Sequence, residues 1–246
     1  SLYKGDVMNI QRLFERIMSF LNWTAALMSI GTLIYLVGFI LVKGIPYIKP
    51  SLFSFTYNSE NVSLMPALIS TVMMTLLSLL IAVPLGVFAA IYLTEYAGRG
   101  NNAVSVIRIT AETLSGIPSI VYGLFGLLFF VTYLGWGFSL LAGAFTLAIM
   151  ILPLIMRSSE EALKAVPDIY REGAFGLGAG KLRTVFKIVL PSAMPGIFAG
   201  IILAIGRITG ETAALIYTAG TVAQIPENPM MSARTLSVHM YALSGE

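Results

Sequence analysis

The chain has no cysteine, one histidine and few charged side chains: 15 lysines and arginines and 12 aspartates and glutamates among 246 residues. The missing cysteine excludes a disulfide framework, a thiolate metal site and a cysteine nucleophile in this sequence. The lone histidine, His239, is too little for a dedicated metal cage. Charged residues make up 11% of the chain and hydrophobic residues 57%, whereas soluble domains carry about 25% charged residues. This composition is typical of an integral membrane protein.

Five apolar segments are near or above the roughly 20 residues that a helix needs to cross a bilayer. We therefore expect an all-α transmembrane helix bundle with spans over 23–42, 66–93, 115–134, 138–156 and 192–219. Apolar residues at helical spacing over 8–21 predict an amphipathic helix at the membrane surface, or a solvated helix packed on neighbouring protein. The stretch 116–123, GIPSIVYG, predicts a flexible kink or a helix start with Glu112 and Thr113 near its N-terminus.

Lysine and arginine are concentrated on one side of these spans. With the N-terminus inside, the inner segments 1–22, 95–114 and 157–191 hold 3, 2 and 6 basic residues, whereas the outer segments hold three. The positive-inside rule then predicts a multi-pass cell-membrane protein with a cytoplasmic N-terminus. The expected parts are a cytoplasmic segment with the interfacial helix over 1–22, a transmembrane domain over 23–219 and an extracytoplasmic tail over 220–246. Either the protein has five spans, or a sixth lies beyond Glu246.

The inner segment 157–191 is too regularly patterned for a slack linker. Short apolar stripes predict two short helices, the first begun by Pro167 and ended by the glycines at 176, 178 and 180. The second is expected over 182–189 and should stop at Leu190-Pro191. Two short helices held under a membrane bundle indicate a docking surface for a soluble partner.

This segment resembles the EAA loop of ABC importer permeases. Glu172-Gly173-Ala174, Gly178 and Ile188-x-Leu190-Pro191 follow the pattern EAA-x3-G-x9-I-x-LP, with Gly173 where alanine is commoner. In that family the first short helix fits a groove on the ATP-hydrolysing subunit. The resemblance implies that Glu172, Gly173 and Ala174 contribute to this ATPase coupling and that Gly178 makes the tight turn between the helices. Without the pattern, Glu172 would be a solvated carboxylate on a helix face.

The resemblance extends over most of residues 64–222, to the phosphate-specific permeases of type I (MetI-like) importers and among them the PstA-like subunit. It is carried by LLIAVPLGVFAAIYLTEYA (79–97), ETLSGIPSIVYGLFGL (112–127), LPLIMRSSEEALKAVP (152–167) and GRITGETAALIYTAG (206–220). It implies six spans, a homologous permease, two ATP-binding subunits and an extracytoplasmic phosphate-binding protein. The chain would then be no enzyme and bind no cofactor, with ATP and magnesium on the ATPase. A permease for sulfate, molybdate or an amino acid, or a non-transporting scaffold, remains the alternative.

Two ionisable residues, Arg207 and Glu211, lie inside the last apolar segment. A charge at bilayer depth costs roughly 2.5–3.5 kcal/mol and by default indicates a functional site. Four residues apart on a helix, the two could form a pair. The resemblance places them on the translocation path, where Arg207 would bind an oxyanion and Glu211 would accept a hydrogen bond from a protonated phosphate oxygen. The alternative is a salt bridge that locks helix register.

Other features of the spans are weaker signals. Arg157, at the inner end of the fourth predicted span, is either a further path residue or an ordinary positive-inside anchor. The last segment also contains two GxxxG steps, which predict close helix packing, at glycines 196, 200, 206 and 210.

Overall fold

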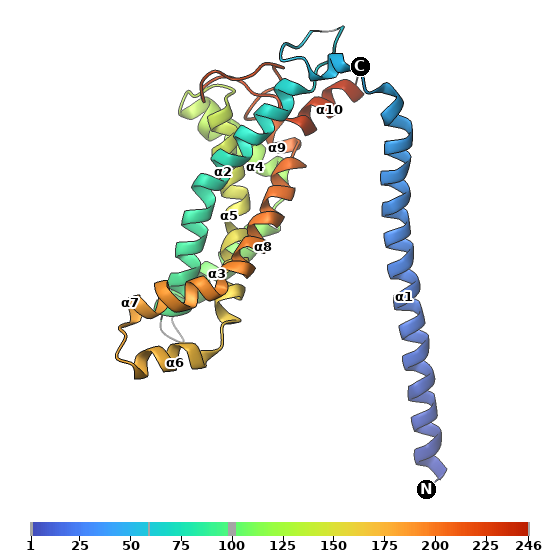
Figure 1. Ribbon diagram of the computed structural model, residues 1–246, viewed down its shortest axis with the longest axis vertical. Helices are drawn as coiled ribbons and strands as arrows, with labels where there is room; N and C mark the ends of the chain where they lie inside the picture. Colours follow the sequence, from blue (N-terminus) through green and yellow to red (C-terminus); the bar gives the residue numbers. More distant parts are fainter. Residues whose placement is uncertain (1, 59, 98–101, 246) are drawn as a thin grey trace. The chain divides into compact units, whose positions relative to one another are not determined.

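The computed structural model describes residues 2–58, 60–97 and 102–245, and within these ranges the regular secondary structure is entirely helical (Figure 1). Four helices there are long and apolar enough to cross a membrane: Arg12–Tyr47, Met65–Tyr96, Leu140–Lys164 and Lys181–Thr209. A bent pair, Val104–Ser115 with Ser119–Tyr133, makes a fifth span if it is counted as one. The predicted all-α membrane bundle is therefore confirmed. The chain divides into two compact units between Pro50 and Ser51.

The first unit contains one long helix, α1 (Leu2–Gly44), which is followed by the short 3-10 turn η1 (Ile45–Tyr47). The surface helix and the first span, predicted as separate elements, are thus one helix without a break. Polar side chains in its apolar part bond to their own helix, as when Thr24 Oγ1 donates to the Phe20 carbonyl at 2.7 Å. Such internal bonds suit a helix in lipid, where no water is present to satisfy a hydroxyl.

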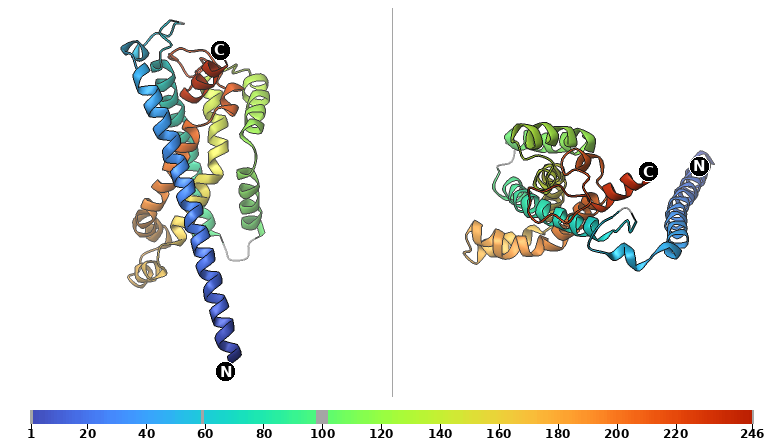
Figure 2. Two further views of the ribbon diagram at one scale, coloured as in Figure 1. Left: turned by 90° about the vertical axis from the view of Figure 1, so that its right-hand side faces the viewer. Right: turned by 90° about the horizontal axis from the view of Figure 1, so that it is seen from above.

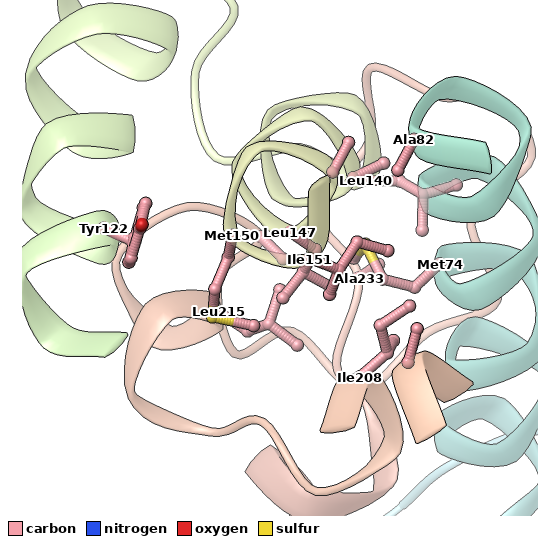
Figure 3. Packing of buried hydrophobic residues seen from close by; sticks show 14 of the residues in the cluster. Met74, Ala82, Tyr122, Leu140, Leu147, Met150, Ile151, Ile208, Leu215 and Ala233 are labelled. Atoms are coloured by element: carbon pink, nitrogen blue, oxygen red, sulfur yellow. The ribbon is translucent and has the colours of Figure 1, made fainter. Parts of the chain in front are cut away.

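The second unit is built around α5 (Leu140–Lys164), which lies among α2 (Met65–Ile91), α4 (Ser119–Gly126) and α8 (Leu190–Thr209) (Figures 1 and 2). Ser139 begins α5, because its Oγ accepts a hydrogen bond from the backbone N–H of Ala142 at 3.2 Å. In an apolar 18-residue stretch of α5, 67% of the residues are buried, whereas the value for α2 is 33%, so α5 is the core helix. Figure 3 shows its side chains meeting those of neighbouring helices, among them Met74, Leu147, Met150, Ile151, Ile208 and Leu215.

Glycines allow α8 to approach α5 closely at the first of the two predicted GxxxG steps. A Cβ on Gly200 would lie 2.0 Å from Ser158 Oγ, and one on Gly196 would lie 2.7 Å from Ala162 Cβ. Among the described residues, no atom beyond the adjacent backbone of its own helix lies within 4 Å of a Cβ built on Gly206. The small-residue packing prediction is therefore confirmed for the first step, whereas the second step makes no such contact.

The third predicted span, 115–134, is wrong at its start. Helix α3 (Asn102–Ser115) occupies much of the expected inner loop, and the chain then bends by 99° before α4, which continues as the π-helical η4 (Leu127–Tyr133). Pro118 is the N-cap residue of α4, and because proline has no N–H it cannot continue α3. The helix-start interpretation is confirmed, but Glu112 and Thr113 lie at the end of α3 instead of near the N-terminus of α4.

The stop predicted at Leu190-Pro191 is also wrong. α7 (Lys181–Thr184), the π-helical turn η5 (Val185–Val189) and α8 follow one another without a gap. Leu190 N–H bonds to the Val185 carbonyl five residues earlier. Pro191 follows this π-helical turn directly, so the helix continues through the proline instead of stopping there.

The last predicted span, 192–219, ends early. α8 stops at Thr209, and the short helix α9 (Ala213–Ile216) follows it. The segment after α9 packs back on the start of α5, where the Thr218 carbonyl accepts from Ser139 N–H at 3.1 Å. Beyond it, α10 (Leu236–Ser244) is tied to α2 by a 2.8 Å bond from Leu236 N–H to Thr71 Oγ1. We call this end of the second unit the α10 end and the opposite one the α6 end (Figure 1).

Candidate functional site

A pocket of about 570 Å³ lies among α3, the later half of α5 and α8, and it is rich in charged residues. Its lining includes four basic residues, Arg108, Arg157, Lys164 and Arg207, and three carboxylates, Glu112, Glu160 and Glu161. Charges of this density beside apolar helices need water, a partner or an ion as compensation. The pocket is therefore the first candidate for a binding site.

The three basic residues nearest the α6 end are paired with carboxylates. Glu160 is buried and accepts Arg108 at 2.7 Å and Lys164 at 2.5 Å. Arg157 reaches Glu161 at 3.3 Å and Glu112 at 4.0 Å, and all three of these side chains are more than 60% exposed. Exposed pairs contribute only about 0–1 kcal/mol, so Arg157 is free to exchange its partners.

Arg207 differs from these three, because it forms no ion pair with any carboxylate in the described part of the chain. It lies half-buried in the last turn of α8 and lines the pocket beside Leu203. The negative end of the helix dipole favours a cation at this position by a few tenths of a kcal/mol, up to about 1. A guanidinium presents a planar fork of donors that matches the geometry of an oxyanion.

The predicted pairing of Arg207 with Glu211 is wrong, because the helix ends between them. Glu211 lies past Gly210, and its Oε1 accepts the backbone N–H of Ala214 at 3.1 Å, at the start of α9. Its own carbonyl accepts from Ser237 Oγ at 2.6 Å. With only 9% of its surface exposed, Glu211 is held in the loop and does not line the pocket.

The EAA-like residues lie on α6 (Asp168–Gly176) and in the turn that follows it. Glu172 and Gly173 are exposed, whereas Ala174 is buried against the same unit. Gly178 has φ +81°, a left-handed conformation that glycine adopts without strain. The N–H of Gly178 bonds to the Phe175 carbonyl at 2.9 Å, which closes the turn before α7.

Large apolar side chains are exposed around this turn. They come from α6, the turn and α7, and they are Ile169, Tyr170, Phe175, Leu177 and Leu182. Leu177 is 91% exposed. Exposed apolar side chains on a segment that also carries charged residues are typical of a protein-interaction surface.

Residues 82–243 match the family described as binding-protein-dependent transport system inner membrane component. This stretch includes the pocket, α6 and most of the second unit. The chain belongs to this family. Its membership and its apolar helices make it a multi-pass membrane protein.

Individual relatives agree with this family. The chain is 40% identical to the probable ABC transporter permease YqgI of Bacillus subtilis (strain 168) over 178 residues, which are 67% of this chain and 60% of the relative. It is 36% identical to the phosphate transport system permease PstA of Pasteurella multocida (strain Pm70) over 215 residues, 85% of this chain and 75% of the relative. For the probable phosphate transport permease PstA of Methanocaldococcus jannaschii, identity is 32% over 238 residues, with 95% and 83% covered. The chain spans about 60% of the length of the B. subtilis relatives.

Within this inner membrane component, the structure brings Arg207 and Arg157 to one pocket and leaves Glu211 outside it. Sequence reasoning missed the other charged residues of the pocket, Arg108, Glu112, Glu160, Glu161 and Lys164. The i,i+4 spacing of the pairs 157/161 and 160/164 within RSSEEALK was a signal available in the sequence.

Proposed function

We propose that this chain is the permease subunit of an ATP-driven importer that carries inorganic phosphate into the cytoplasm. The family and the phosphate transport permeases among its relatives support the proposal. The observation that carries it is the guanidinium of Arg207, which has no carboxylate partner among the described residues and lines a pocket of about 570 Å³. Four cations and three carboxylates leave the pocket with one net positive charge, which suits an anion in transit.

Arg207 binds the phosphate in this proposal, through two parallel N–H···O bonds. Arg157 lies in the same pocket and is held only by exposed carboxylates, so it can turn to the anion as the anion moves toward the α6 end. Glu211 remains the proposed acceptor for a protonated phosphate oxygen, a bond that sulfate cannot supply at neutral pH. To reach the anion, Glu211 must release its bond to Ala214 N–H.

The proposed assembly has a homologous permease, two ATP-binding subunits and an extracytoplasmic phosphate-binding protein. ATP and magnesium are held by the ATP-binding subunits, and this chain hydrolyses nothing itself. The N-terminus and the α6 end lie in the cytoplasm. There, Glu172 and Gly173 face the ATP-binding subunit from the exposed side of α6, while buried Ala174 supports the helix from within. The exposed apolar side chains of the same helix, Ile169, Tyr170 and Phe175, supply the contact area.

Uptake of labelled phosphate by the complete transporter in liposomes tests this function. Arg207→Gln removes the charge, and Arg16→Gln, on the exposed surface of α1, is the matched control. Wild type and Arg16→Gln should take up phosphate with ATP, and the uptake rate of Arg207→Gln should be lower by at least about thirtyfold, since charged bonds to a substrate are worth roughly 2–5 kcal/mol. Equal phosphate uptake by Arg207→Gln and Arg16→Gln would show that transport does not need the charge of Arg207. Competition by equimolar sulfate would overturn the phosphate assignment and leave a permease for another oxyanion.

A further inference from the structure

One partly buried ion pair connects α6 to a distant part of the chain. Arg171, in the middle of α6, donates to Glu95 from Nη2 at 2.6 Å and from Nε at 3.1 Å. The two residues are 76 positions apart in sequence, and their side chains are only 15% and 9% exposed. Glu95 belongs to the π-helical turn η3 (Tyr92–Tyr96), which continues α2 at the α6 end.

The remaining donors of Arg171 hold the start of α6 against the end of α5. Nη1 bonds to the Val166 carbonyl at 2.8 Å and to Asp168 Oδ1 at 3.1 Å, and Nη2 bonds to the Leu163 carbonyl at 3.0 Å. All five N–H groups of this guanidinium are therefore accounted for. The bond to Glu95 is the main reason that the pKa of Arg171 is raised above its usual value.

A second contact joins the same turn to α7. The ammonium of Lys181 lies over the ring of Tyr96, 5.0 Å from its centroid. Both α6 and α7 thus contact η3 through a cation, although this second contact is the weaker kind, at about 0.5–1 kcal/mol when exposed. Both short helices therefore contact η3, the turn that continues α2.

Covalent connections make the Arg171 contact important for α2. α6 follows α5 after the short link Ala165–Pro167, and α7 runs through η5 into α8, so both of these long helices are joined to the short helices by backbone. α2 has no such backbone connection, because its turn η3 is far from α6 in the sequence. Side-chain contacts therefore link α6 directly to the turn after α2, and the Glu95–Arg171 pair is the one that uses every donor of a guanidinium. Apolar packing of Ile91 and Leu93 against the ends of α5 and α8 is a parallel route.

We propose that the Glu95–Arg171 pair is the joint through which movement of α6 reaches α2, which makes both residues positioning residues for ATP-driven transport. The inference rests on the proposed function in one respect: an ATP-binding subunit must act on α6. A rigid joint suits this task, since a buried pair with all donors used cannot slip as an exposed pair can. α2 packs along α5, so a shift of α2 changes the core helix that lines the pocket.

The experiment uses single cysteines as reporters, because the 246 residues contain none. Tyr92→Cys on η3 and Leu177→Cys after α6 are both at exposed positions, and each carries an environment-sensitive fluorophore in the complete transporter in liposomes. Both reporters should change signal when ATP is added. With Glu95→Gln, we expect the Tyr92 signal change to fall by about fivefold or more, while the Leu177 change persists.

The same variants are then tested for phosphate transported per ATP hydrolysed. Glu95→Gln should lower this ratio by about tenfold with ATP hydrolysis retained, since the two helices are uncoupled. Glu227→Gln, an exposed carboxylate near the α10 end, is the matched control and should leave the ratio unchanged. Arg171→Lys keeps the charge without the planar fork, and we expect it to restore part of the Tyr92 response that Arg171→Gln loses.

Three results would overturn the joint. The first is a Tyr92 reporter whose signal does not change with ATP in the otherwise unchanged chain. The second is a Tyr92 signal change that persists in Glu95→Gln. The third is an equal loss of the Tyr92 and Leu177 signal changes in Glu95→Gln, which indicates that the variant affects docking or folding. The reporters need ATP but no phosphate. A normal reporter pattern without phosphate uptake would therefore refute the proposed substrate and leave the joint intact.

Discussion

Two sets of ion pairs in this chain use the same residue types in opposite ways. In the pocket, Arg157 contacts Glu161 and Glu112 with all three side chains mostly in solvent. At the α6 end, Arg171 contacts Glu95 with both side chains nearly buried and every N–H bonded. Exposed pairs exchange partners at little cost, which suits the proposed release of an anion from this pocket. Buried pairs fix geometry, because separating them leaves a charge without solvent.

Removing one member of the buried pair should have the largest effect on stability. Arg171→Ala leaves the partly buried Glu95 without its cation, and such losses cost up to about 3–5 kcal/mol. Arg183→Ala, on exposed α7, is the control and should stay within about 0.5 kcal/mol of wild type. Thermal unfolding of the purified membrane protein in detergent measures both. Equal midpoints for the two variants would mean that the buried pair is no stronger than an exposed one.

The close contact between α5 and α8 at Gly200 should give the second-largest effect on stability. Gly200→Ala brings a methyl group onto Ser158, in the α5–α8 contact beside the pocket, and overpacking of this kind costs about 1–3 kcal/mol. Gly206→Ala has open space and should be neutral or stabilising by up to about 1 kcal/mol, because alanine favours the helix. Adding Ser158→Gly to Gly200→Ala should recover much of the loss. Failure of that recovery would place the strain elsewhere.

The sequence predicted what depends on local pattern. Membrane spans follow from the length of apolar runs, and the turn at Gly178 follows from a spaced motif around α6. The prediction for Arg207 and Glu211 failed because i,i+4 geometry requires an unbroken helix, and α8 ends at Thr209. The contact of Arg171 with Glu95 could not be predicted from spacing, since only the packing of α6 under α2 brings these residues together.

His239 is a buried titratable residue, and no carboxylate of the described residues forms an ion pair with it. Its ring is fully buried against Tyr57, and burial, together with the charge of Arg234, holds its pKa below 6.5. The unfolded chain then binds more protons than the native one, so stability should fall as pH drops below about 6.5 through the lowered native pKa. Thermal unfolding at pH 7.5 and pH 5 measures this loss. His239→Gln should reduce its pH dependence, and an unchanged dependence would assign the loss to other groups.

Arg157→Gln should have the smallest effect on stability, within about 1 kcal/mol, because its ion pairs are exposed. If the comparison between the two sets of pairs is right, function should respond differently from stability. Arg157 lines the proposed anion pocket, so its loss should raise the KM for phosphate uptake while the unfolding midpoint hardly moves. Glu161→Gln should lower the KM for phosphate uptake, because it frees Arg157 for the anion. A stability loss comparable to that of Arg171→Ala, with normal uptake, would show that Arg157 is a structural anchor and that exposure does not separate the two sets.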